Sequence, residues 1–375
     1  KIQRSTRSPY TIRDLGTGKF GLFEGEEQVN LDIYFLSTKS DVMEEPLTSR
    51  GTPVFTLLDQ RRWCFAMMPV RYCEYFATGD QCKFCNFNGT QDDARAIGLE
   101  RAVTINPDDA VEAYKILSSR VRFVEGRLEM GGFMGTEQEA KLHLNFVEKL
   151  AGAASYKPNL SVHGQPLRRK DLQRIKDVGA DCLVMQPEVW DPQLFAEVCP
   201  GKAKRDGYQR YKEACVEGVD VLGAGNVGIN YVGGVTLIPA NGFKTWQEAR
   251  DSQIEGNNWA IENGVMPIFT NLRMPPGSVY GAEPTLREKI PPTEYYLDLT
   301  LAHHQTMMQH GLYEKLNKLM FCGFHCHVGP YAGEMGMLAL AGDVGNWMAD
   351  AVPEEANWLA RFIASVKEPA KAELE

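Results

Sequence analysis

Short apolar runs alternate with amphipathic segments from about residue 61 onward, and this alternation constrains the fold more than any other feature of the sequence. Six strand-then-helix units follow one another within about 220 residues, and most of their strands are apolar throughout. Strands of this kind are typical of a parallel sheet whose two faces are covered by helices. The sequence therefore predicts an α/β fold. An open doubly wound sheet and a full or partial (β/α) barrel both fit the periodicity.

Turn and capping residues place the expected elements along this region. Thr136-x-x-Glu139 and Thr245-x-x-Glu248 both match a capping box, in which two side chains at a helix start satisfy each other's backbone amides. The strands expected between the helices are, in order, RWCFAMMPV, RLEMGGFMG, NLSVHGQ, ADCLVMQPE, VGINYVGGVTLI and VMPIFTNLRMPPG.

Three regions are expected along the chain. Residues 1–60 contain short alternating stretches, among them KFGLFEG, VNLDIYFL and PVFTLL, which predict a β-rich N-terminal extension. Residues 61–285 hold the six strand–helix units. Residues 286–375 are mainly helical in pattern and are expected to form a C-terminal helical cap.

Charge and cysteine content narrow the class of protein. A net charge of −9 argues against a broad phosphate-binding surface, so a nucleic-acid partner is not expected. No apolar run approaches the roughly 20 residues that a membrane span needs, and the first residues, KIQRSTRSPY, lack the apolar segment of a secretion signal. Nine cysteines in a chain of this size indicate a reducing compartment with free or metal-bound thiols. We therefore expect a cytoplasmic protein without membrane contact.

Three of those cysteines crowd the stretch RYCEYFATGDQCKFCNF, in which Cys73, Cys82 and Cys85 have the spacing Cys-x8-Cys-x2-Cys. A disulfide, a zinc site and an iron–sulfur cluster are the alternatives. Zinc normally takes four protein ligands, often as two short pairs, and only one short pair is present. Three thiolates on a [4Fe–4S] cluster would leave one iron open to an exogenous ligand. The stretch follows the first expected strand, where parallel α/β folds place their active sites.

At these residues the sequence resembles the radical S-adenosylmethionine (SAM) superfamily, and within it the branch of biotin synthase and the hydrogenase maturases. The family holds a [4Fe–4S] cluster with three cysteines after the first strand of a partial (β/α)6 barrel. An aromatic residue typically precedes the third cysteine, as Phe84 precedes Cys85 here. The first gap departs from the pattern, since it has eight residues where the commonest spacing has three. The resemblance implies a TIM-like partial barrel over residues 61–285.

The resemblance also implies a set of SAM-binding residues. Gly131 and Gly132 follow the second strand, where the family has a glycine pair near the methionine amine. Glu188 ends the fourth strand and Arg210 lies in the next helix, where that branch places a polar contact and an arginine for the SAM carboxylate. Phe84 is expected to flank the adenine. A plain Gly-Gly turn and a solvated helix arginine are the alternatives for the glycine pair and for Arg210.

Candidate catalytic residues lie in two further places. Cys326 and His325 belong to the unusual run CGFHCH at 322–327, which could supply a proton or hydrogen-atom donor, bind an auxiliary metal, or be a set of buried structural thiols. His163 ends the third expected strand and points by position toward the barrel mouth, although a hydrogen-bonded structural histidine is the alternative.

The function implied is reductive cleavage of SAM at the cluster to a 5′-deoxyadenosyl radical that takes hydrogen from a small-molecule substrate. Rearrangement, fragmentation and bond formation are all compatible with the sequence. An external one-electron donor of the flavodoxin or ferredoxin type is expected as a partner. The alternatives are a non-catalytic zinc- or iron–sulfur-binding scaffold, and a radical SAM enzyme that inserts sulfur or modifies a macromolecule.

Overall fold

The structure is a computed structural model, and it describes residues 10–16, 19–33, 46–61, 64–96, 98, 101–119, 123, 125–153 and 157–311. The chain divides into two compact units, residues 1–44 and 45–375, which are described separately. Within the described residues, no helix combines the length and the apolar character needed to cross a bilayer.

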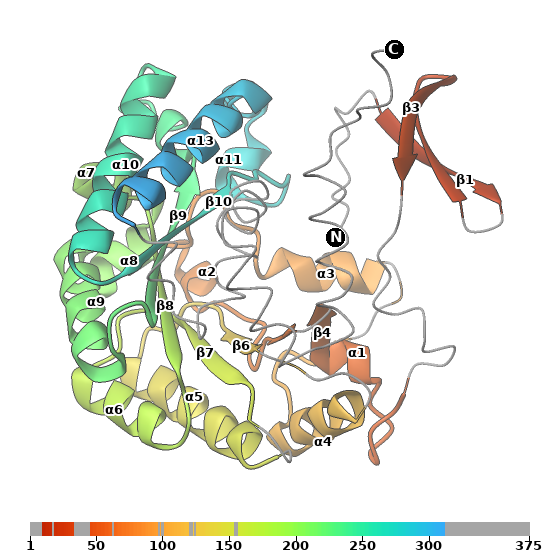
Figure 1. Cartoon of the computed structure of the whole chain (residues 1–375), viewed down its shortest axis with the longest axis vertical. Helices are drawn as coiled ribbons and strands as arrows, with labels where there is room; N and C mark the ends of the chain where they lie inside the picture. Colours follow the sequence, from red (N-terminus) through yellow and green to blue (C-terminus); the bar gives the residue numbers. More distant parts are fainter. Residues whose placement is uncertain are drawn as a thin grey trace. The chain divides into compact units, whose positions relative to one another are not determined.

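The first unit contains a three-stranded antiparallel sheet (Figure 1). Its strands are β1 (Tyr10–Gly16), β2 (Lys19–Glu24) and β3 (Glu27–Ile33), in the order β1-β2-β3. The guanidinium of Arg13 lies 4.4 Å from the ring centre of Phe23 and donates a 2.8 Å hydrogen bond to Glu26. The expected strands KFGLFEG and VNLDIYFL correspond to β2 and to the described part of β3.

The second unit is built on a seven-stranded sheet in the order β10-β9-β8-β7-β6-β5-β4. Its strands are β4 (Leu58–Arg61), β5 (Cys64–Met67), β6 (Glu125–Glu129), β7 (Asn159–Gly164), β8 (Cys182–Glu188), β9 (Val227–Gly233) and β10 (Met266–Asn271). β5 to β10 are parallel and correspond to the six predicted strands, whereas β4 pairs antiparallel with β5. Each strand pairs with its neighbour in sequence, without the reversal that defines a doubly wound sheet. The fold is therefore a partial (β/α)6 barrel, and β4 and β10 remain its two edges among the described strands.

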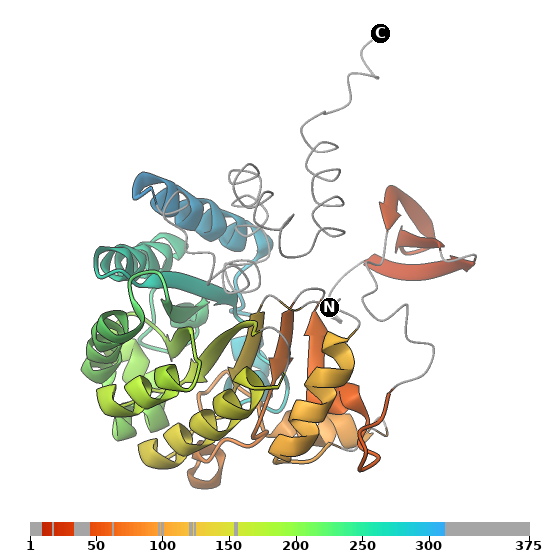
Figure 2. The same ribbon diagram turned by 60° about the horizontal axis from the view of Figure 1, so that its bottom comes forward.

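The long helices lie along the convex side of this curved sheet (Figures 1 and 2). They are α4 (Pro107–Ser118), α5 (Thr136–Ala151), α6 (Arg169–Asp177), α9 (Tyr208–Leu222) and α10 (Trp246–Glu262). Shorter or later elements are α1 (Val54–Leu57), α2 (Tyr75–Thr78), α3 (Gly89–Ala96), α7 (Pro192–Val198), α8 (Pro200–Arg205), η1 (Val235–Leu237), α11 (Val279–Ala282), α12 (Pro284–Arg287) and α13 (Thr293–Gln309). α13 packs on α10, where Asn257 and His303 are hydrogen-bonded at 2.9 Å.

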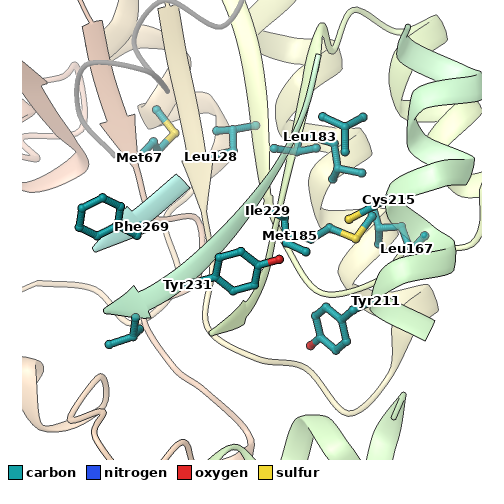
Figure 3. Close-up of a cluster of buried hydrophobic side chains, with 14 of the residues drawn as sticks. Met67, Leu128, Leu167, Leu183, Met185, Tyr211, Cys215, Ile229, Tyr231 and Phe269 are labelled. Atoms are coloured by element: carbon teal, nitrogen blue, oxygen red, sulfur yellow. The ribbon is translucent and has the colours of Figure 1, made fainter. Parts of the chain in front are cut away.

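The hydrophobic core lies between the sheet and these helices. Figure 3 shows Met185 of β8 beside Cys215 of α9 and Leu167, and all three side chains are buried. Full burial of one large apolar side chain stabilises a fold by about 1.5–3 kcal/mol. This packing fixes the six parallel strands in register, so that their carboxyl ends meet at one edge of the sheet.

Two local predictions were wrong. PVFTLL, expected as a strand, begins with the helix α1, because Pro53 starts a helical turn in which Thr56 Oγ1 donates to the Pro53 carbonyl, and β4 follows from Leu58. An apolar run this short does not distinguish a strand from a buried helix turn.

The second error concerns the capping box at Thr136. Gly135 is the N-cap of α5 and makes no side-chain cap, while the Glu139 carboxylate turns into the protein interior. The capping box of Thr245 and Glu248 at the start of α10 is confirmed, with both reciprocal hydrogen bonds formed.

Candidate functional site

The three cysteines of the Cys-x8-Cys-x2-Cys stretch lie on one loop that leaves the carboxyl end of β5. Asn88 closes this loop, since its Oδ1 accepts a 2.8 Å hydrogen bond from the Cys73 amide and its Nδ2 donates to the Cys73 carbonyl. The Cys85 amide donates to the Cys82 carbonyl at 2.9 Å, which turns the chain between these two ligand candidates. The loop is therefore folded on itself, with its three side chains at the edge where an α/β fold places its chemistry.

The three thiols are neighbours and they differ in acidity. Cys73, Cys82 and Cys85 are free thiols, all half-buried. Burial raises the pKa of Cys73, and it raises the pKa of Cys85 to about 12, with the Cys82 sulfur adding to both shifts. A hydrogen bond with the Cys199 thiol lowers the pKa of Cys82, and the Lys202 ammonium adds to this against the effect of burial. The Cys73 and Cys85 thiols are therefore both within electrostatic reach of the Cys82 sulfur.

The described residues do not bring three His, Cys, Asp or Glu side chains together as tightly as a single metal ion requires. Tetrahedral ligands around one zinc ion, each about 2.3 Å from the metal, stand only about 4 Å apart. A cubane presents its irons at separate corners, so its thiolates are spread more widely.

A glycine pair after β6 packs directly against this loop. A Cβ added to Gly131 would lie 2.3 Å from the Tyr72 carbonyl oxygen and 2.9 Å from the Cys73 Cα. A Cβ on Gly132 would lie 2.5 Å from the Tyr75 ring and 3.3 Å from the Cys73 sulfur. The absence of side chains at both positions is what lets the ends of β5 and β6 meet at the cysteine loop.

Glu188 joins the site from the end of β8. Its carboxylate forms a 2.6 Å ion pair with Lys202 of α8, and both side chains are almost completely buried. The negative charge of Glu188 adds to the raised pKa of Cys85 and opposes the lowering of the pKa of Cys82. Burying two opposite charges requires close geometry and further hydrogen bonds, and Lys202 also donates to the Gln186 carbonyl.

A second buried network supports the loop from the other side. Arg205 Nη1 lies 3.0 Å from the fully buried carboxylate of Glu139, and Gln165 donates its backbone amide to the same carboxylate at 2.8 Å. The Tyr75 hydroxyl, which belongs to the cysteine loop, donates to the Gln165 side-chain oxygen. Burial raises the pKa of Glu139, and Arg205 opposes that shift. Glu139 therefore links β7, α5 and α8 to the loop instead of capping α5.

The remaining predicted residues lie at different distances from this cluster of side chains. Phe84 is half-buried and packs against the core. His163, on the inner face of β7, is 3.0 Å from the Ser161 hydroxyl through Nε2. Arg210 makes a bidentate pair with Glu217 of its own helix, at 2.8 and 2.9 Å, and also donates to the Leu167 carbonyl, so these hydrogen bonds do not bring it to the cysteine loop. Cys326 and His325 lie outside the described residues.

Sequence reasoning missed three residues that contact the site, Cys199, Lys202 and Arg205. All three come from the segment CPGKAKR at 199–205, which has the composition of a solvated basic turn. The only local signal is the pair Pro200-Gly201, because a Cβ at Gly201 would lie 2.5 Å from the Tyr75 ring.

Comparisons by sequence match no known family profile and no curated protein. Solved structures with a similar fold include HydG, a maturase of the [FeFe]-hydrogenase, with 12% identity over 66% of this chain and 51% of that chain and a TM-score of 0.47. A radical SAM methyltransferase from Sphaerobacter thermophilus has 14% identity over 65% and 63% of the two chains and a TM-score of 0.42. Coproporphyrinogen III oxidase (HemN) from Escherichia coli, a radical SAM enzyme, has 13% identity over 67% and 54% and a TM-score of 0.40. This chain thus spans about half to under two thirds of these structures, and at such identities the chemistry must be judged from its own residues.

Proposed function

We propose that this chain is a radical SAM enzyme in which Cys73, Cys82 and Cys85 bind a [4Fe–4S] cluster. The observation that carries the proposal is the position of these three thiols on one loop at the carboxyl edge of an open six-stranded parallel barrel, where Cys73 packs against Gly131 and Gly132. The proposed regions are an N-terminal β-rich extension over 1–60, the catalytic barrel over 61–285 and a helical cap over 286–375. We further propose a cytoplasmic location, in keeping with the reduced thiols.

The residues of the loop fit such a cluster chemically. Thiolates are the ligands that iron–sulfur clusters take, and three of them leave one iron for another ligand. When bound, the cluster and SAM together supply a 5′-deoxyadenosyl radical that removes hydrogen from the substrate. Gly131 and Gly132 leave room for close backbone approach, and Phe84 offers an aromatic surface for adenine. Glu188 is proposed to contact SAM, and Lys202 holds its carboxylate in place. Arg210 remains a proposed contact for the SAM carboxylate.

The inner face of the barrel supports a polar small molecule as the substrate. Arg127 and Glu129 of β6 lie opposite Ser161 and His163 of β7 in the register of the sheet. Arg127 Nη1 is 3.5 Å from Glu129 Oε1, and His163 contacts Ser161. The intervening outward-facing residues, such as Leu128, pack in the hydrophobic core. We propose that His163 acts on the substrate in this lumen, and that Cys326 and His325 also act on the substrate. An external one-electron donor of the flavodoxin or ferredoxin type would reduce the cluster.

Release of 5′-deoxyadenosine from SAM tests the proposal. The protein is reconstituted anaerobically with iron and sulfide, reduced with dithionite and incubated with SAM, alone and with small polar metabolites. We expect release above background that requires the cluster, is lost in Cys82→Ala and is retained in Cys215→Ala, which removes a buried thiol of α9. Release that is equal in the Cys82→Ala variant, or absent from protein with a full cluster, would contradict the proposal.

The tail residues need a separate assay. We expect Cys326→Ser to abolish product formation while cleavage of SAM continues without coupling to the substrate. Unchanged product formation would assign Cys326 a structural role.

A further inference from the structure

The joint between α7 and α8 is fastened to the cysteine loop by backbone hydrogen bonds. The Lys83 amide, between the second and third cysteines, donates to the Val198 carbonyl at 2.9 Å. The Gly201 amide donates to the Asp80 carbonyl at 2.9 Å, on the other side of Cys82. Two backbone hydrogen bonds, one on each side of Cys82, therefore hold the joint against the cysteine loop.

These hydrogen bonds bring the side chains of Cys199 and Lys202 close to Cys82. The Cys199 thiol, which has no exposed surface, is hydrogen-bonded to the Cys82 thiol. The Lys202 ammonium, fixed by Glu188 and by the Gln186 carbonyl, acts electrostatically on the Cys82 sulfur. The Lys202 ammonium and the Glu188 carboxylate act on the Cys82 sulfur in opposite directions, and the ammonium is held in place by the Gln186 carbonyl and by Glu188 itself.

We propose that Cys199 and Lys202 set the reduction potential of the cluster bound by Cys73, Cys82 and Cys85, an inference that rests on the proposed function. Hydrogen bonds to cluster sulfurs and the charge around them tune the potential of iron–sulfur centres. The step concerned is the uptake of one electron from the external donor, which makes the cluster one unit more negative. A thiol S–H directed at a ligand sulfur and a nearby ammonium both stabilise that reduced form. Both are positioning residues and neither is a ligand.

Redox titration of the reconstituted protein tests this role independently of turnover. The proteins compared are the wild type, Cys199→Ala, Cys199→Ser, Lys202→Met and Lys202→Arg. Each is loaded with iron and sulfide anaerobically, and its content of both is measured. The reduced cluster is then followed by electron paramagnetic resonance as the solution potential is varied. Cys215→Ala is the matched control, because it removes an equally buried thiol from α9. The Cys199 series leaves the buried ion pair intact, so it remains informative where Lys202→Met folds poorly.

We expect every variant to retain its iron. Cys199→Ala and Lys202→Met should each lower the equilibrium constant for one-electron reduction by about tenfold, which is a shift of about 59 mV to lower potential. Cys199→Ser, which keeps a hydrogen-bond donor, and Lys202→Arg, which keeps the charge, should lie between wild type and those variants. Cys215→Ala should match wild type.

Two results would overturn the inference while leaving the proposed function intact. One is an unchanged reduction potential in both Cys199→Ala and Lys202→Met when each carries a full cluster. The other is loss of iron from both Cys199 variants, which would make Cys199 a ligand or a structural support. Wild-type protein that binds no iron would instead overturn the proposed function, and the inference with it.

Discussion

Lys202 Nζ lies 2.6 Å from Glu188 Oε1, and the two side chains are only 9% and 11% exposed. Glu188 is also the one residue other than glycine with a positive φ, 70°, in the part of the chain that the structure describes. A left-handed backbone at such a residue costs about 1–3 kcal/mol and persists only where its surroundings impose it. The buried ion pair holds the Glu188 side chain at this left-handed position at the end of β8.

Removing one partner of this pair should destabilise the protein strongly. Lys202→Met leaves the Glu188 carboxylate buried without its counter-charge, and we expect the free energy of unfolding to fall by about 3–5 kcal/mol. Urea denaturation of the metal-free protein measures this change. Arg169→Met, which breaks the pair with Asp220 whose side chains are 54% and 56% exposed, is the control and should cost about 0–1 kcal/mol. Equal, small losses in both variants would contradict the account of Glu188.

Binding of the cluster should depend on the absence of a side chain at Gly131. The Cβ added by Gly131→Ala would lie 2.3 Å from the Tyr72 carbonyl oxygen. Because this oxygen belongs to the backbone, it cannot move away without a shift of the cysteine loop. We expect this variant to lose most of the iron that the wild type binds after anaerobic reconstitution. Gly152→Ala, where the nearest atom lies at 3.8 Å, should load normally. Full iron content in Gly131→Ala would show that the contact is not needed to form the site.

Acid sensitivity should arise in part from His143 of α5. Burial lowers the pKa of this histidine to about 3 from an unfolded value near 6.5. Below pH 6.5 the unfolded chain therefore binds a proton that the folded protein does not, so stability is lost as the pH falls toward 3. Between pH 7 and pH 5 this difference amounts to about 2 kcal/mol.

The variant His143→Leu isolates that effect. Its free energy of unfolding, measured in urea at pH 7 and at pH 5, should change by about 2 kcal/mol less between the two pH values than that of the wild type. Parallel pH dependence in the two proteins would show that the pKa of His143 is the same in the folded and the unfolded chain.

Much of the fold follows from the sequence, because the six parallel strands are apolar runs that helix packing covers. Strand order could not be read from periodicity, since a doubly wound sheet and a barrel have the same alternation. The order became evident only from strand pairing. Thr245 and Glu248 cap α10 as predicted, whereas the same pattern at Thr136 failed because Glu139 binds Arg205, a partner far along the chain.

The candidate site was predictable where its residues form a local motif and hidden where they do not. The three cysteines and the pair Gly131-Gly132 stand out by spacing, and the structure packs Cys73 against both glycines. Cys199 and Lys202 belong to no motif, and their proximity to Cys82 depends on how the α7–α8 joint is fastened to the loop. A contact of this kind depends on tertiary packing, which a single sequence does not encode in any short pattern.

The content of iron, sulfide and zinc after anaerobic reconstitution tests the central claim most directly. The account predicts a brown protein with about four irons and as many sulfides per chain, as one cubane cluster implies, and a large loss of both in Cys82→Ala but not in Cys215→Ala. A colourless protein that takes up one zinc ion per chain, or a Cys82→Ala variant with a full cluster, would contradict it.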